Sequence, residues 1–201
     1  QTHARRRCLA YALDDQVVFD ARAWAGAWRP YALLAEAARA SEGLKPGQRF
    51  PDIAYLDPAG RPRKLSDDRG RVLVLHFWGS WCPPCQREMP DLQKLHGRLK
   101  ADSNLRFVFL PVREPVARSR DWLKDKGIAL PLSDGGPAAG KDGAFLLHDG
   151  RKIGDRDMAR VFPTTYVLDR HGLVLFAHVG PVSDWSALAP LLKDAVAGSG
   201  R

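Results

Sequence analysis

One continuous stretch in the middle of the chain decides the fold: Val72-Leu73-Val74-Leu75-His76-Phe77-Trp78-Gly79-Ser80-Trp81-Cys82-Pro83-Pro84-Cys85. Its first six residues form an apolar run of strand length between Gly70 and Gly79, which is typical of a strand buried on both faces. Beyond the second cysteine, apolar residues recur at helical spacing and predict a helix that packs one stripe on a core; they are Met89, Leu92, Leu95 and Leu99. The two cysteines therefore stand between a buried strand and the start of a helix.

Two cysteines separated by two residues are a specific signal at such a junction. We expect Cys82 at the helix N-terminus, where unpaired backbone amides and the helix dipole favour the thiolate. The thiolate would attack a partner disulfide, and Cys85, one turn along, would then attack the mixed disulfide and release the reduced partner. The spacing predicts a thiol–disulfide redox pair, with Cys82 as the more exposed sulfur and Cys85 as the buried one.

Half of a structural zinc site is the rival interpretation of this pair, and it needs two further ligands. The only other cysteine is Cys8, near the N-terminus, and the sequence holds no histidine pair with finger-like spacing. We therefore expect no metal at the pair. The sequence gives no reason to involve Cys8 in catalysis.

The pattern on either side of the junction predicts a mixed sheet. A strand at 72–77, the helix that the cysteines open and a strand at 105–112 follow one another, which implies a parallel pair with a right-handed crossover. A further helix is expected at 115–126. Two later strands around a turn would close the sheet with an antiparallel hairpin, and a final helix would be capped by Ser183, reach about Val196 and be kinked at Pro190; the two strands are 165–168 and 173–179.

The chain divides into an extension, residues 1–44, and a domain, residues 45–201. The extension contains a predicted helix over 29–39, and Trp24 and Trp28 are expected to pack rather than bind a ligand. The domain opens with an expected hairpin around the turn at 57–60. It also carries an insert at about 131–157, rich in Gly and Asp.

Composition excludes several classes of protein. The chain has 201 residues, 45% of them hydrophobic, and a formal net charge of +8. Apart from Arg5-Arg6-Arg7 the basic residues are dispersed among acidic ones, which favours a solvated basic surface without a nucleic-acid partner and leaves an acidic protein partner as the alternative.

No stretch approaches the roughly 18 apolar residues of a membrane-spanning helix. The chain begins with Gln1, and a signal peptide is not visible, so these features do not settle the compartment.

A longer run around the cysteines resembles a known family: His76-Phe77-Trp78-Gly79-Ser80-Trp81-Cys82-Pro83-Pro84-Cys85-Gln86-Arg87-Glu88-Met89-Pro90. It is similar to the TlpA/ResA/CcmG family of thioredoxin-like bacterial thiol–disulfide oxidoreductases. The resemblance covers about 44–196 and includes the later run Val161-Phe162-Pro163-Thr164-Thr165-Tyr166. It implies an α/β thioredoxin-like fold, with a mixed central sheet flanked by helices, and no cofactor.

The resemblance also implies the cellular role. It implies reduction of a client protein's disulfide, in cytochrome c maturation or copper-site assembly, by a chain that a membrane thiol donor of the DsbD type reduces in turn. The implied compartment is the periplasm or cell envelope. The extension before residue 44 has no counterpart in the family, and the insert at 131–157 looks longer than usual, so the client stays open.

A second group of site residues follows from the resemblance. Pro163 matches the proline that is cis in thioredoxin folds, where it faces the cysteines and exposes the preceding backbone to a client peptide. Phe162 precedes it, and Trp81, Pro83 and Pro84 flank the first cysteine. These five residues are the expected client contacts.

Two ionisable residues near the pair are candidates for proton transfer. Glu88 lies one helical turn beyond Cys85; the resemblance marks it as an acid–base group for the buried thiol, and a solvated helix residue is the alternative. His76 lies inside the predicted strand, where the family often has Asn. Its neutral imidazole would accept or relay a proton from Cys85 near neutral pH, or it is a hydrogen-bonded core histidine without a catalytic role.

Two other functions occur on this fold. Copper-binding chaperones of the Sco type carry a Cys-x-x-x-Cys site and a histidine close to the region that matches Pro163. In this chain the two cysteines are separated by two residues, and His171 falls in the turn after the strand that follows Pro163. Peroxidase chemistry requires one cysteine of low pKa, usually without an adjacent partner. Both fit this chain less well than a dithiol oxidoreductase.

The two prolines predict the direction of electron transfer. Pro83 and Pro84 remove two backbone N–H groups from the first helical turn, which are among the donors that could stabilise a thiolate there. The Cys82 thiolate should be only moderately favoured, which predicts a reduction potential nearer the roughly −270 mV of thioredoxin than the roughly −120 mV of a strong oxidase.

Overall fold

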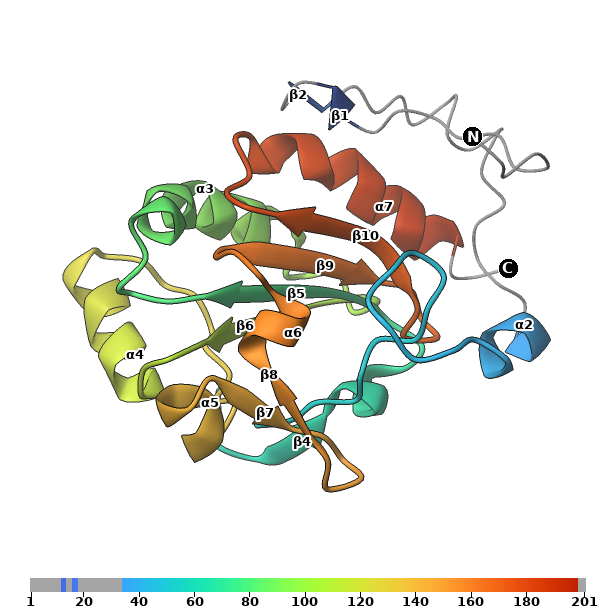
Figure 1. The fold of residues 1–201 in the computed structure, drawn as a ribbon. Coiled ribbons are helices and arrows are strands. Elements are labelled where there is room, and N and C mark those ends of the chain that lie inside the picture. The colour runs from blue at the N-terminus through green and yellow to red at the C-terminus, as the bar shows by residue number, and fades with distance from the viewer. Residues whose placement is uncertain (1–11, 14–15, 18–33, 199–201) are drawn as a thin grey trace.

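The computed structural model describes residues 12–13, 16–17 and 34–198 (Figure 1). Within them, the helix expected in the extension is represented by α2 (Leu34–Ala38). The expectations for Cys8, Trp24 and Trp28 fall outside the described residues and stay predictions, as does the boundary between extension and domain.

A four-stranded mixed sheet forms the centre of the molecule, in the order β10-β9-β5-β6. The parallel pair of β5 and β6 runs in register from Val72 opposite Leu105 to Trp78 opposite Pro111. β9 is antiparallel to both β5 and β10. The mixed sheet expected from the sequence is therefore confirmed, with these strands: β5 (Val72–Trp78), β6 (Leu105–Pro111), β9 (Thr164–Leu168) and β10 (Val174–Val179).

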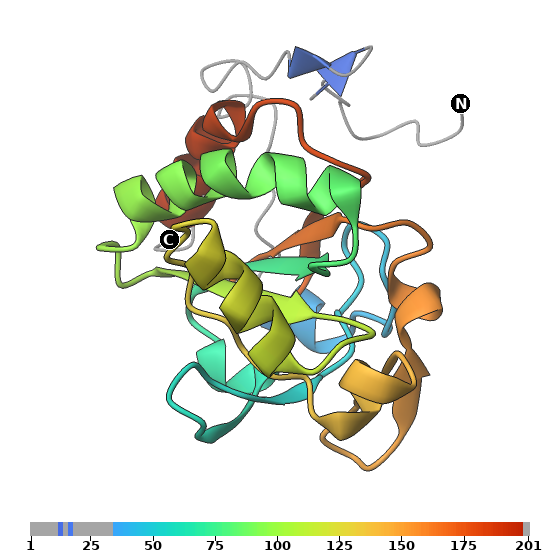
Figure 2. The ribbon, with the colours of Figure 1, turned by 90° about the vertical axis from the view of Figure 1, so that its left-hand side faces the viewer.

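Helices and hairpins occupy opposite sides of this sheet. Helices α3 (Pro83–Leu99) and α7 (Leu188–Gly198) cover one face, as the two views in Figures 1 and 2 agree. Two short hairpins lie on the other side; they are β3 (Ala54–Leu56) with β4 (Pro62–Lys64), and β7 (Ala144–Leu146) with β8 (Lys152–Gly154). The first of them is the hairpin expected around the turn at 57–60.

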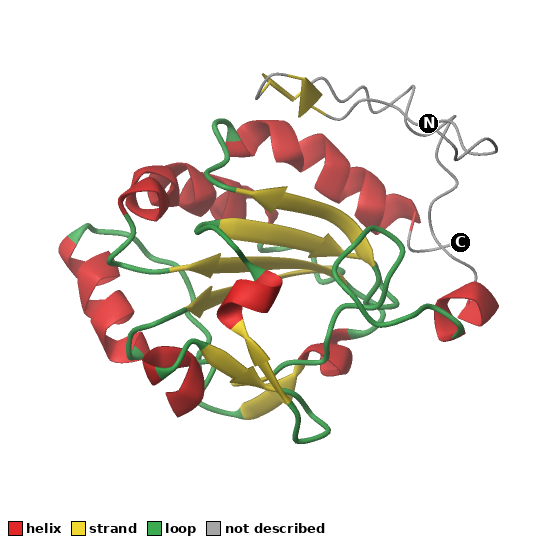
Figure 3. Ribbon diagram, viewed as in Figure 1, coloured by secondary structure: helices red, strands yellow, loops and turns green. Residues whose placement is uncertain are grey.

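The remaining described elements connect these layers. Figure 3 shows the short helix α6 joined by one loop to the central strand β9. In the part of the chain that the structure describes, no helix is long and apolar enough to cross a membrane. The connecting elements are η1 (Leu65–Asp68), α4 (Val116–Asp125), α5 (Pro137–Lys141), α6 (Asp155–Met158), η2 (Trp185–Ala187) and the pair β1 (Ala12–Leu13) and β2 (Gln16–Val17).

Strand β5 is buried along its whole length, as its apolar sequence predicts. Successive side chains of a strand point to opposite faces of the sheet. Phe77 points to the hairpin side, where its ring lies 5.5 Å from that of Phe145 in β7. His76 therefore points to the face that α3 covers. The alternation along β5 places the one ionisable residue of the strand beside the helix that carries the cysteines.

The end of the chain differs from the prediction. The N-cap at this point is Asp184, not Ser183: its carboxylate accepts a 2.8 Å hydrogen bond from the Ser186 amide and begins η2, which leads directly into α7. Pro190 is the third residue of α7 and does not interrupt it. A first-turn N–H has no partner within the helix, so a proline there costs no hydrogen bond and suits the start of a helix.

Candidate functional site

Cys82 and Cys85 form a disulfide at the start of α3, with their Cα atoms 5.3 Å apart. Cys82 is the N-cap residue of α3, and Pro83 and Pro84 are its first two helical residues. The Cys85 amide donates to the Cys82 sulfur at 3.3 Å. Both cysteines are buried, Cys82 at 3% and Cys85 at 0% exposure, so the order of exposure agrees with the expectation by a narrow margin.

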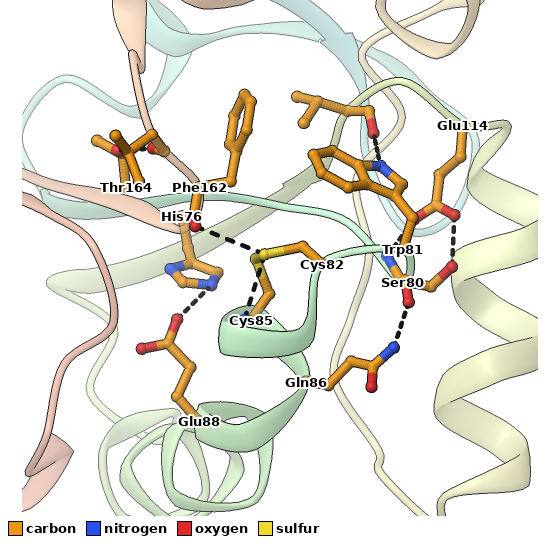
Figure 4. Close-up of a disulfide and its surroundings, with 12 residues drawn as sticks. His76, Ser80, Trp81, Cys82, Cys85, Gln86, Glu88, Glu114, Phe162 and Thr164 are labelled. Carbon is orange, nitrogen blue, oxygen red and sulfur yellow. Dashed lines mark hydrogen bonds and ion pairs between the residues drawn. A yellow bond between two sulfur atoms is a disulfide. The ribbon is translucent and has the colours of Figure 1, made fainter.

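The sheet brings the Pro163 loop to the redox pair. β9 is antiparallel to β5, and Thr164 at its start pairs with Phe77 at the end of β5. The Phe162–Pro163 peptide bond is cis, as expected. The Phe162 carbonyl oxygen lies 3.5 Å from the Cys82 sulfur and can accept a hydrogen bond from that thiol when the pair is reduced (Figure 4).

His171 lies at the opposite end of the sheet. It belongs to the turn between β9 and β10, and Leu168, at the end of β9, pairs with Leu73 near the start of β5. The copper-chaperone alternative needs a histidine beside the sulfurs, and His171 does not meet this requirement. Among the described residues, no group of three or more His, Cys, Asp and Glu side chains gathers where a metal ion could bind.

Trp81 directly precedes Cys82 and is 40% exposed. Its indole nitrogen donates to the Val112 carbonyl oxygen at 2.8 Å, and its ring meets the Phe162 ring edge to face, with centroids 5.7 Å apart. The expected client contacts therefore converge around Cys82. Pro83 is exposed and Pro84 is half-buried beside them.

Glu88 is buried, which excludes the alternative of a solvated helix residue. Its Oε2 accepts hydrogen bonds from the Val182 amide at 2.8 Å and from the Trp185 indole nitrogen at 3.2 Å. Burial nevertheless raises the pKa of Glu88 to about 8, because removing the carboxylate from water outweighs the two donors. The side chain is therefore protonated at neutral pH.

His76 faces the other oxygen of Glu88. Its Nε2 lies 3.4 Å from Glu88 Oε1 (Figure 4). Its Nδ1 lies 3.0 Å from Thr165 Oγ1. Within the described residues neither Nε2 nor Oε1 has another hydrogen-bond partner. Complete burial lowers the pKa of His76 to about 3, so the ring is neutral at physiological pH. Because two N–H donors occupy Oε2, the proton of Glu88 belongs on Oε1, where the neutral Nε2 accepts it.

One buried carboxylate at the site was missed by the sequence analysis. Glu114 is 3% exposed and accepts hydrogen bonds from the Ser80 amide, from the Ser80 hydroxyl and, at 2.7 Å, from the Ser119 hydroxyl. The Gln86 side-chain amide donates to the Ser80 carbonyl oxygen. The loop before Cys82 is thereby held from both sides. Glu114 stands just before α4, where an acidic residue is usually a solvated neighbour of a helix start, so its local sequence gives no signal of this contact.

The profile of the Redoxin family matches residues 45–192. The chain belongs to the Redoxin family. This Redoxin chain is 25% identical over 138 residues to the thiol-disulfide oxidoreductase ResA of Halalkalibacterium halodurans, a match that covers 69% of the chain and 70% of that protein. It is 27% identical over 142 residues to the thioredoxin-like protein YneN of Bacillus subtilis, covering 70% and 75%.

Solved structures of similar fold agree with this assignment of the Redoxin chain. A protein from Chlorobium tepidum, described as a candidate thiol:disulfide interchange protein DsbE, is 25% identical with a TM-score of 0.58; the match covers 79% of the chain and 100% of that structure. A secreted thiol-disulfide isomerase from Corynebacterium glutamicum is 26% identical with a TM-score of 0.54, covering 74% and 85%. The thioredoxin-like fold and the resemblance to the TlpA/ResA/CcmG family are confirmed, and with the Cys82–Cys85 disulfide they identify a thiol–disulfide oxidoreductase.

Proposed function

We propose that this oxidoreductase reduces disulfides of client proteins. The Cys82 thiolate attacks one client sulfur, and the other client sulfur leaves as a thiolate that takes up a proton. The Cys85 thiolate then attacks Cys82 in the mixed disulfide and expels the first client sulfur. Two electrons pass to the client, and the pair ends as the disulfide present in this structure.

The observation that carries the direction is the set of hydrogen-bond donors at Cys82. Pro83 and Pro84 have no N–H, and the Cys85 amide at 3.3 Å is the backbone donor to the Cys82 sulfur among the described residues. A helix start with more amides would stabilise the thiolate, and hence the reduced form, more strongly. Because a weakly stabilised reduced form gives its electrons away readily, this arrangement supports a reductase.

Glu88 and His76 exchange a proton with the buried thiol in this proposal: the fraction of Glu88 that is ionised near its pKa of about 8 takes up the proton of Cys85. The pKa of Glu88, about 8, is close to the roughly 8.5 of an unperturbed cysteine, so a proton passes between the two with little free-energy cost. His76 supports both states of Glu88: its Nε2 accepts from the acid, and after a change of tautomer the same nitrogen donates to the carboxylate while Thr165 donates to Nδ1. Glu88 and His76 lie on the side of α3 that carries Cys85 (Figure 4).

Client and donor react in turn with the same sulfur, that of Cys82. The client-contacting residues in this proposal are Trp81, Pro83, Pro84, Phe162 and Pro163, which surround Cys82. The electron donor is a membrane dithiol protein of the DsbD type, and the work takes place in the periplasm or cell envelope. Cytochrome c maturation and copper-site assembly are the processes in which we place the client.

Electron transfer between the protein and a disulfide peptide tests the direction. We expect the reduced protein to convert the peptide disulfide to two thiols, with one Cys82–Cys85 disulfide formed per peptide, as counted by mass spectrometry after acid quenching and alkylation. The reverse mixture, oxidised protein with the dithiol peptide, is expected to stay largely unreacted. Complete reaction of the reverse mixture would overturn the reductase assignment, and Cys82→Ser is the control that should react in neither direction.

A further inference from the structure

Large apolar side chains remain exposed around the redox pair. Trp81, Val161 and Val179 are 40%, 51% and 56% exposed. Val161 precedes Phe162, and Val179 pairs with Thr164 at the start of β9. These three side chains therefore border the Phe162–Pro163 loop and Cys82, at the one end of the sheet where a client disulfide must be reached.

Two arginines border this apolar surface on the α6 side. The Arg156 guanidinium lies 5.5 Å from the centre of the Phe162 ring, and its Nη1 donates to the Arg160 carbonyl oxygen. Arg160 directly precedes Val161, and both arginine side chains are exposed. Neither forms an ion pair with any other described residue, whereas seven other arginines do. The charges of Arg156 and Arg160 can therefore pair with carboxylates of a partner protein.

The carboxylates at this edge are already engaged. Asp155 is buried and pairs with Arg113. Asp157 is exposed and accepts from the Gly154 amide at 3.2 Å, so it keeps its charge and offsets one of the two arginines. Glu114 is buried beneath the loop before Cys82, where hydroxyl and amide donors satisfy it. Positive charge therefore predominates around Arg156 and Arg160, in a chain whose formal net charge is already +8.

We propose that Arg156 and Arg160 select clients that carry acidic residues beside the cysteine that Cys82 attacks. The inference rests on the proposed function and names the chemistry of its client. A client strand that lies across Cys82 along the Phe162–Pro163 loop continues past Val161 toward Arg160. Arg160 is two residues before Phe162, which corresponds to about 7 Å of extended chain. A carboxylate two or three residues from the client cysteine therefore reaches the arginines, while an apolar neighbour covers Trp81 or Val161.

Ion pairs between these exposed arginines and client carboxylates would mainly raise the rate of association and the discrimination between clients. Each arginine–carboxylate contact at the surface is expected to change the rate of client reduction by roughly two- to five-fold. The effect should fade with added salt, because the Debye length falls from about 30 Å at 0.01 M to about 3 Å at 1 M ionic strength. These features separate charge selection from apolar packing at Trp81, which salt does not screen.

The test uses two disulfide peptides with the same cysteines and the same apolar neighbours, flanked by glutamates in one and by lysines in the other. Second-order rates of reduction by the reduced full-length protein are measured at low and high ionic strength. We expect the glutamate peptide to react at least about five-fold faster at low salt, and the ratio to approach one at high salt. Arg156→Gln/Arg160→Gln should lose most of this preference.

The matched control is Arg69→Gln/Arg98→Gln, which removes the same charge from two exposed positions remote from the redox pair. Arg69 precedes β5 at the end of the sheet opposite the cysteines, and Arg98 lies near the end of α3. The control should keep the preference of the wild-type protein. An equal loss in both double variants would assign the preference to net charge and overturn the inference, as would equal rates for the two peptides. If neither peptide is reduced, the proposed function fails and the inference fails with it.

Discussion

Replacing Cys85 with serine is expected to leave a client covalently attached to Cys82. The first step needs only Cys82, whereas release of the client needs the buried sulfur of Cys85, which the structure holds within bonding distance of Cys82. We expect multiple turnover to fall at least about a thousand-fold, because the nucleophile of the second step is absent. The measurement is the rate of peptide-disulfide reduction, with the covalent adduct identified by mass spectrometry.

Cys82→Ser is the matched control for the trapping experiment. It should be equally inactive but form no adduct, because Cys85 is fully buried and cannot reach a client. An adduct on Cys85 in this control, or preferential alkylation of Cys85 in the reduced wild-type protein, would reverse the two roles.

Replacing Glu88 with glutamine is expected to stabilise the protein at alkaline pH. Glutamine reproduces the bonding of the protonated acid, since its amide group can donate to His76 Nε2 while its oxygen accepts from Val182 and Trp185. It has no proton to lose. The wild-type protein must bury a carboxylate charge as the pH rises, and the variant does not.

The sign and size of this effect follow from the shift in the pKa of Glu88. Folding raises the pKa from 4.5 to about 8, so the folded state holds a proton that the unfolded state has released. The resulting stability is fully present below pH 4.5 and is lost as the pH rises through about 8. At about 1.4 kcal/mol per unit of pKa, the loss is on the order of 5 kcal/mol.

Urea unfolding of the oxidised proteins measures this loss. Comparing Glu88→Gln with the wild type at each pH removes the contribution of every other titrating group. We expect similar free energies of unfolding near pH 5, and an advantage for the variant that grows to several kcal/mol near pH 9. A difference that does not change with pH would show that Glu88 is ionised in the folded protein, and the proton-transfer role proposed for it would then fall.

The sequence predicts the central elements of this fold because their signals are local. The apolar run of β5 and the helical spacing of Met89, Leu92, Leu95 and Leu99 depend on neighbours along the chain, and all of these residues are buried as expected. The N-terminal hairpin and the closing β9–β10 pair were found from their turns. The final helix was misassigned at its start because Ser183 and Asp184 are adjacent residues of similar capping preference.

The candidate site is only partly predictable, because its chemistry depends on contacts between distant segments. Spacing predicts Glu88 one turn beyond Cys85, but its raised pKa comes from burial in the folded chain. The two donors that partly oppose this rise, Val182 and Trp185, lie 94 and 97 positions later in the chain. The contact between His76 and Glu88 could not be predicted from the sequence either, because the two side chains meet only when α3 packs on β5. Glu114 gave no local signal at all, and only the folded chain brings it beneath Ser80.

The reduction potential of the Cys82–Cys85 pair tests the central claim most directly. Equilibration of the protein with glutathione buffers and with dithiothreitol buffers of known ratio, followed by alkylation and mass spectrometry, gives the fraction reduced at each potential. The proline-rich helix start predicts a value nearer the roughly −270 mV of thioredoxin, as a reductase of client disulfides requires. A value near the roughly −120 mV of a strong oxidase would mean that the protein inserts disulfides, and would contradict the account.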